Sequence, residues 1–221
     1  KLPQPSTEAT AETTEPELKK VTNVLLADTK QMKVVALDTS LDSRYFMLTL
    51  SLENKSRSDV YLELENIYLN GVLCEHSGYG INLIGEELRM LELHWERTAM
   101  ERRGIDPDTV TVIEGEVSGY YQDDSAKLDT VSFAYYPYGE ENAAFLSYTP
   151  DEDDVVLLDT GEFFIAATDN WVNEDNAWVQ QVVCINRLDE DRIFSVEEER
   201  VNHHLIRTYW NTWVKAGRIA Y

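Results

Sequence analysis

The side chains that could do chemistry in this sequence are mostly carboxylates, because 41 of its 221 residues are Asp or Glu. They gather in short runs, at 151–154, 189–191 and 197–199. A glycosidase needs two carboxyl groups at a set separation, one of them with a pKa raised by burial. Acidic runs are instead typical of turns and solvated strand faces. The sequence therefore singles out no catalytic acid.

Two acidic segments invite comparison with calcium loops. DNWVNEDN, residues 169–176, and TPDEDD, residues 149–154, are rich in carboxylate and amide oxygens. Calcium loops place such ligands at alternating positions and bend at a glycine. Neither segment has that glycine or that spacing, so we interpret both as solvated turns and predict no metal site.

Histidine and cysteine give no further active-site pattern. His203 and His204 are adjacent, so on a strand they would point to opposite faces and could not share a metal ion simply. Cys74 and Cys184 lie in the apolar runs GVLC and VVCI, where buried thiols are the ordinary outcome, and a bridge between them would need an oxidising compartment. No nucleophile motif or phosphate-binding glycine loop is present. We predict that the protein is not an enzyme and needs no cofactor.

Aromatic residues offer a candidate interaction surface. The segment YWNTWV contains Tyr209, Trp210 and Trp213, which we predict to form an interface. Such rings could stack on sugars or fill a partner's pocket, or they could cover contacts between domains. The net charge of −22 repels phosphates, so nucleic acid is excluded as a partner.

Alternating apolar and polar residues predict the elements that would position these side chains. The pattern predicts strands over 31–40, 44–54, 60–69, 88–95, 109–121 and 127–138. Asn70-Gly71 favours a type I′ hairpin turn, and residues 96–104 favour a short helix ended by Gly104. Short strands with frequent turns are typical of an all-β sandwich.

The strand pattern recurs along the chain. A shift of 131 residues places Asp28-Thr29 on Asp159-Thr160, and a shift of 132 places Asn54 on Asn186 and Gly85 on Gly217. We therefore predict four regions: a disordered Thr/Glu/Pro-rich tether (1–20), a sandwich (21–138), an acidic linker (139–154) and a second, incomplete copy (155–221). We expect the incomplete copy to pack against the first copy or against a second molecule, which would give a homodimer.

The segments LSLENKS, VYLELENIYLNG, RRGI and TVTVIEGEV resemble immunoglobulin-like domains of exported lipoproteins from Gram-positive, often gut-dwelling, bacteria. The resemblance implies tandem immunoglobulin-like antiparallel β-sandwiches, with one short helix in the first copy. It also implies an extracellular, cell-surface location, with membrane attachment only through a lipid anchor upstream of Lys1. Most such families have no assigned activity, so it implies no catalytic residues.

Together these features predict a non-catalytic cell-surface module that binds a partner or spaces another domain. The partner would be a protein or a glycan of the cell surface. The alternative is a carbohydrate- or cation-binding accessory module of an extracellular system. An exposed coplanar row of aromatic rings or a clustered carboxylate loop would favour that alternative.

Overall fold

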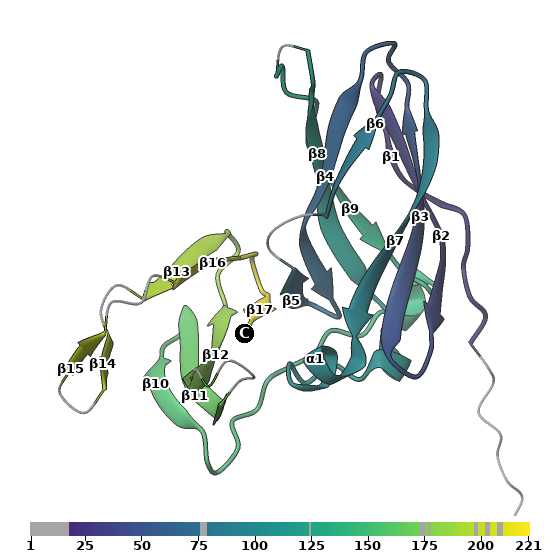
Figure 1. Ribbon diagram of the computed structural model, residues 1–221. Coiled ribbons are helices and arrows are strands. Elements are labelled where there is room, and N and C mark those ends of the chain that lie inside the picture. Colours follow the sequence, from purple (N-terminus) through teal and green to yellow (C-terminus); the bar gives the residue numbers. More distant parts are fainter. Residues whose placement is uncertain are drawn as a thin grey trace, which may run out of the picture.

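The computed structural model describes residues 18–75, 79–123, 125–172, 176, 178–196, 199–201, 204–206 and 210–221. Most of the predicted tether lies outside this range. The described chain is mostly β-strand, with one short α-helix, which confirms the predicted all-β class (Figure 1). The elements are β1 (Val24–Asp28), β2 (Met32–Leu41), β3 (Tyr45–Asn54), β4 (Val60–Leu69), β5 (Val72–Glu75), β6 (Tyr79–Leu83), β7 (Leu88–Glu96), α1 (Arg97–Glu101), the 3₁₀ turn η1 (Pro107–Thr109), β8 (Ile113–Tyr121), β9 (Val131–Tyr135), the 3₁₀ turn η2 (Glu140–Asn142), β10 (Val155–Asp159), β11 (Phe163–Val172), β12 (Trp178–Asn186), β13 (Arg192–Val196), β14 (Glu199–Val201), β15 (His204–Ile206), β16 (Trp210–Val214) and β17 (Ile219–Ala220).

The N-terminal unit, residues 18–138, is built from two layers. One layer has the strand order β1-β2-β3-β7, and the other contains β5, β4, β8 and β9, with β6 also paired to β4. Alternation explains how the layers meet: Leu48, Leu50 and Leu52 of β3 and Leu62 and Leu64 of β4 are fully buried in one core. Burying each such side chain contributes about 1.5–3 kcal/mol.

The C-terminal unit, residues 155–221, lies beside the sandwich (Figure 1). Its strands β10, β11 and β12 continue through β17 into the β5-β4-β8-β9 layer, forming one sheet across both units. Two hairpins, β13–β16 and β14–β15, form separate two-stranded sheets. The two units are therefore joined by backbone pairing and not only by a linker.

Two sequence-predicted turns adopt the expected backbone. Asn70 and Gly71 have φ values of 48° and 83°, as a type I′ turn requires at both positions. Gly104 follows the short helix α1 with φ 69°, the left-handed conformation of a helix C-cap. The predicted strands are also present, but β1, β5 and β6 were not predicted as separate strands.

Strand pairing in the C-terminal unit matches that of the N-terminal unit position by position. Val24 pairs with Ala36 in β1–β2, and Val155 pairs with Ala167 in β10–β11. Both hairpins have a register shift at the same place, after Leu25 and after Val156. The match concerns backbone pairing, and the duplication of a whole sandwich stays a prediction.

The predicted equivalence of Gly85 with Gly217 is wrong by one residue. Gly217 has φ 65°, and the residue with the matching conformation is Glu86, at φ 60°. Their amides make matching hydrogen bonds, from Glu86 to the Ser56 carbonyl and from Gly217 to the Leu188 carbonyl. A non-glycine residue holds the left-handed position in one unit, so matching glycine with glycine shifts the register.

One buried asparagine anchors each unit. The Asn54 amide group donates to the Ser58 and Ile84 carbonyls, both at 2.9 Å, and its oxygen accepts from the Ser56 amide. Asn186 makes the corresponding bonds to the Glu190 carbonyl at 2.8 Å and the Val214 carbonyl at 2.9 Å. Both side chains are fully buried, so each amide group depends on these partners within the protein for its hydrogen bonds.

We expect Asn54→Ala and Asn186→Ala each to lower the free energy of unfolding by about 3 kcal/mol, because each change removes two hydrogen bonds donated by a fully buried side chain. Urea denaturation of the full chain measures the loss. Asn142→Ala is the control, since its amide donates to the Tyr138 carbonyl in a part-buried turn, and its loss should be clearly smaller. Equal losses in all three variants would contradict the anchoring role.

Candidate functional site

The joint between the units is centred on β17. Ile219 pairs antiparallel with Ile185 of β12 and parallel with Val72 of β5, and its amide donates to the Gly71 carbonyl at 3.1 Å. The two-residue strand β17 therefore links the strands of the two units into one sheet. Such a short strand needs side-chain contacts to hold it, because few backbone hydrogen bonds are available.

Two ion pairs flank this strand. Arg218 donates from Nε and Nη2 to the two carboxylate oxygens of Glu114, each at 2.8 Å, and the Lys215 Nζ lies 3.1 Å from a Glu116 oxygen. The Glu114 carboxylate raises the pKa of Arg218. All four side chains are at most a quarter exposed, so the pairs are partly shielded from water. They fix the C-terminal unit to the outer surface of β8.

Tyr68 of β4 reaches across the joint. The Lys215 amide donates to its hydroxyl oxygen at 2.9 Å, and the hydroxyl donates to the Trp213 carbonyl at 3.3 Å. The ring is fully buried with Cys184, Phe194, Val214, Leu73 and Ala220, in a second apolar cluster made by both units. Burial raises the pKa of Tyr68 to about 12.

Strands β11 and β12 of the C-terminal unit carry buried side chains on both faces. The fully or almost fully buried Phe164, Ala166 and Val183 belong to the main core, whereas Cys184 belongs to the second cluster. By strand register, Phe164 and Val183 occupy the positions of Lys33 and Ser51 in the N-terminal unit. The outer face of the C-terminal sheet therefore has apolar residues where the N-terminal unit has polar ones. This apolar face packs at the joint.

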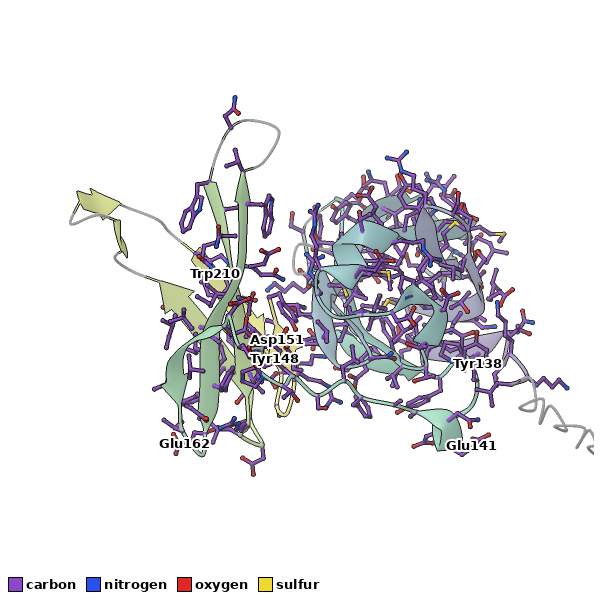
Figure 2. The ribbon with its side chains drawn as sticks, turned by 90° about the horizontal axis from the view of Figure 1, so that it is seen from below. Tyr138, Glu141, Tyr148, Asp151, Glu162 and Trp210 are labelled. Atoms are coloured by element: carbon purple, nitrogen blue, oxygen red, sulfur yellow. The ribbon has the colours of Figure 1, made fainter. Side chains whose placement is uncertain are left out.

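A cleft of about 600 Å³ lies at the same joint. Its walls come from residues 101–104 after α1, from residues 146–154, and from Gln181 and Tyr221. Figure 2 shows Tyr148 and Asp151 between the two units. The Gln181 amide donates to the Arg102 carbonyl at 2.9 Å, closing one side of the cleft.

The cleft contains polar groups, but the pKa values of its two tyrosine hydroxyls are raised and not lowered. Burial, together with a hydrogen bond to Asp154, raises the pKa of Tyr148 well above its ordinary value, and burial raises the pKa of Tyr221 to about 12. Both phenols stay protonated at neutral pH and act as hydrogen-bond donors, not as bases or nucleophiles. The Thr168 hydroxyl, buried at the wall, has no hydrogen-bond partner among the described residues, which leaves one polar group for a bound molecule or water.

The second candidate surface is an exposed apolar face on the C-terminal unit. All four apolar residues of β10 are exposed, with Val155 at 58% and Leu157 at 59%. On the neighbouring hairpin, Ile193 and Trp213 are paired across the strands and are 52% and 47% exposed. Clustered exposed apolar side chains of this size mark interaction sites.

The structure divides the predicted interface residues. Trp213 is half exposed on the outer face of the β13–β16 hairpin. Trp210 is partly buried and packs against the second apolar cluster, as the labelled side chain in Figure 2 indicates. Tyr209 lies outside the described residues. Of the three, Trp213 is placed to meet a partner.

The other candidate residues have structural surroundings. Asp154 accepts from the Asp151 amide at 2.7 Å, Asp191 accepts from the Ala216 amide at 2.9 Å, and Asp169 accepts from the amide of its neighbour Asn170. These acids therefore cap turns or strand ends. Among the described residues, no group of three His, Cys, Asp or Glu side chains could hold a metal ion.

Cysteine and histidine show no active-site arrangement where they can be placed. Both cysteines are thiols; Cys184 is buried, and burial raises its pKa to about 12, which makes it unreactive. His203 lies outside the described residues, as do residues 173–175 of the acidic segment DNWVNEDN.

The structure shows the expected packing of the C-terminal unit against the first copy, but sequence reasoning did not identify the residues that make this joint. Tyr68, Glu114 and Arg218 carry no motif, and their pairing depends on how the units dock. A usable signal was present in IAAT and VVCI, because continuous apolar runs indicate strands buried on both faces.

The sequence matches no protein-family model and no curated protein. The part of the chain that the structure describes contains no helix long and apolar enough to cross a membrane.

We expect Arg218→Ala to lower the free energy of unfolding by about 2 kcal/mol, because Glu114 loses a partly buried, two-point partner. Hydrogen exchange should also accelerate at the Ile219 amide. Arg187→Ala is the matched control: Arg187 pairs with Asp159 within the C-terminal unit and is more exposed, so its removal should cost about 0.5 kcal/mol. Similar exchange at Ile219 in both variants would contradict the role of Arg218 in the joint.

Alkaline pH should lower the free energy of unfolding, because the Tyr68 hydroxyl ionises more readily in the unfolded chain than in the folded one. Its pKa of about 12 in the folded state exceeds that of an unfolded tyrosine, so its stabilising contribution is complete below about pH 10 and is lost as pH rises through about 12. Tyr68→Phe should be less stable than the native chain at pH 8, because two hydrogen bonds are lost. That difference should shrink by about 1 kcal/mol at pH 11. Urea titrations at the two pH values measure it, and a constant difference would refute the linkage.

Proposed function

We propose that this chain is a non-catalytic module that binds another protein through its C-terminal unit and holds it in a fixed orientation. The observation that carries the proposal is the exposed apolar surface of β10 and of the Ile193–Trp213 pair. Tryptophan is enriched among the residues that dominate protein-binding interfaces, and Trp213 is 47% exposed.

The joint supports the spacer part of the proposal. A flexible connection between the units would not need the Arg218–Glu114 and Lys215–Glu116 ion pairs. It would also not need the hydrogen bond between the Tyr68 hydroxyl and the Lys215 amide. Because backbone pairing and charge-assisted hydrogen bonds act together, the C-terminal unit is held at one angle to the sandwich.

A protein partner fits these surfaces better than a sugar or a cation. A flat platform of coplanar rings would favour sugar stacking, but the Tyr148 and Tyr221 rings of the cleft meet edge-on, at 77°. The Asp154 carboxylate of the cleft already accepts hydrogen bonds from the Tyr148 hydroxyl and from the Asp151 amide. The exposed apolar residues of β10 and β13–β16 are aliphatic and indole side chains, which suit a protein surface, although Ser195 and Asn211 beside them are polar.

We propose that the module acts outside the cell, tethered at the surface through its N-terminal segment. Support comes from the composition of residues 1–20 and from the strongly acidic character of the folded part, which keeps an exported protein soluble. Protease treatment of intact cells would digest the protein if it is displayed at the surface, and would spare it otherwise.

In cells that make the protein, a photo-crosslinking residue at position 157 or 213 should give adducts with a second protein, because both sites lie on the exposed apolar surface. The same residue at position 57, whose side chain is 94% exposed on the N-terminal unit, is the control. Mass shifts on denaturing gels and peptide mapping read the result. Adducts at all three positions alike, or at none, would count against the proposal.

A further inference from the structure

The joint shows how the outer face of β4 and β8 binds basic side chains. At this end of the face, Tyr68 of β4 is paired with Glu114 of β8, and Glu116 lies two positions further along β8 on the same side. The Lys215 Nζ lies 5.8 Å from the centre of the Tyr68 ring and 3.1 Å from a Glu116 oxygen. Arg218, from the same turn of the chain, is held by Glu114. A tyrosine ring beside glutamate side chains therefore binds a lysine and an arginine here.

A similar set of side chains lies at the other end of the same face, which extends away from the C-terminal unit (Figure 1). Tyr61 of β4 is paired with Tyr120 of β8, and Glu63 and Glu65 are the next residues of β4 on this side. The two tyrosine rings have their centres 5.1 Å apart, and Tyr120 is 37% exposed. We call Tyr61, Glu63, Glu65 and Tyr120 the open end of the face.

Neighbouring residues fix the side chains of the open end. The Tyr61 hydroxyl lies over Gly80 of β6, where an added Cβ would fall 1.7 Å from the hydroxyl oxygen, so a glycine is needed beneath the ring. The Ser118 hydroxyl donates to one Glu65 carboxylate oxygen at 3.1 Å. Partial burial and the charge of Glu63 raise the pKa of Tyr61, which agrees with a position of that carboxylate near the ring. The rings and carboxylates are therefore ordered without a ligand.

The charges of the open end favour a cationic ligand. Within the described chain, neither Glu63 nor Glu65 forms an ion pair, in contrast to the two glutamates at the joint. The exposed Lys127 is paired with Tyr120 at the margin and offsets part of this negative charge. The chain as a whole has a net charge of −22, which attracts cations to its surface. Two glutamates without ion-pair partners beside two tyrosine rings suit a lysine or an arginine.

We propose that the open end is a further interaction surface, which binds a basic loop or turn of a partner protein. A lysine or arginine of the partner would lie over the Tyr61 and Tyr120 rings, with its charge against Glu63 or Glu65. The turn at 215–218 makes contacts of this kind with the adjoining part of the same face. The inference does not rest on binding through the C-terminal unit, because the open end belongs to the N-terminal unit.

The probe for this surface is a peptide with the sequence of residues 214–219, VKAGRI, capped at both ends and titrated into the isotope-labelled full chain. Amide chemical shifts of residues 61–65 and 118–121 should change and then saturate. The same peptide with glutamine in place of its lysine and arginine should leave these shifts unchanged. Shifts that fail to change, or that change alike in other acidic segments such as 151–154, would overturn the proposal.

Matched variants separate the open end from the overall charge of the chain. Glu63→Gln and Tyr120→Leu should each weaken peptide binding about threefold, and together about tenfold, because exposed ion pairs and cation–π contacts each contribute modestly. Glu92→Gln removes the same charge from an exposed position on β7, in the other layer, and should leave the affinity unchanged. An equal loss of affinity in Glu63→Gln and Glu92→Gln would mean that the peptide senses only net charge, and would overturn the proposal.

Two further results identify the occupant and keep this inference separate from the proposed function. A dimer of the native chain in sedimentation that Glu63→Gln abolishes would make a second copy the occupant and refute a separate partner protein. Peptide binding at the open end without crosslinks at positions 157 and 213 would support this inference and refute the proposed function. Crosslinks at those positions without peptide binding would refute this inference alone.

Discussion

The arrangement of the two units depends on Ile219, which pairs with β12 on one side and with β5 on the other. Two strand residues cannot hold two units by backbone hydrogen bonds alone. The neighbouring Arg218 and Lys215 therefore meet Glu114 and Glu116, and the Lys215 amide meets the Tyr68 hydroxyl. Removing any of these contacts acts on the same short strand, so their contributions should be coupled rather than additive.

Alternation made much of the fold predictable. The strands around Leu48, Leu50 and Leu62 follow from a period of two, and the turn at Asn70-Gly71 follows from the conformations that those residues tolerate. These are local rules, in which each residue's type limits its own backbone or its own exposure. The all-β class and the approximate bounds of six strands in the N-terminal unit needed nothing more.

The joint was not predictable in the same way, because its contacts join positions far apart in sequence. Nothing in the type of Glu114 distinguishes a joint residue from any other outward-facing acid on a strand. The shifted match of Gly85 with Gly217 has a related cause: Glu86 adopts a left-handed conformation that sequence identity assigns to glycine. The exposed face of β10 could be predicted only in part, since apolar composition does not reveal what covers a strand.

The double-sided burial of β11 and β12 has a consequence for modularity. Phe164 and Val183 turn the outer face of this sheet into core, although the stretch at 139–154 resembles an ordinary linker. The linker visible in the sequence therefore does not separate two units that are stable independently of each other. In evolution or in engineering, residues 155–221 cannot be transplanted alone, because excision would expose one apolar face in addition to the one already open.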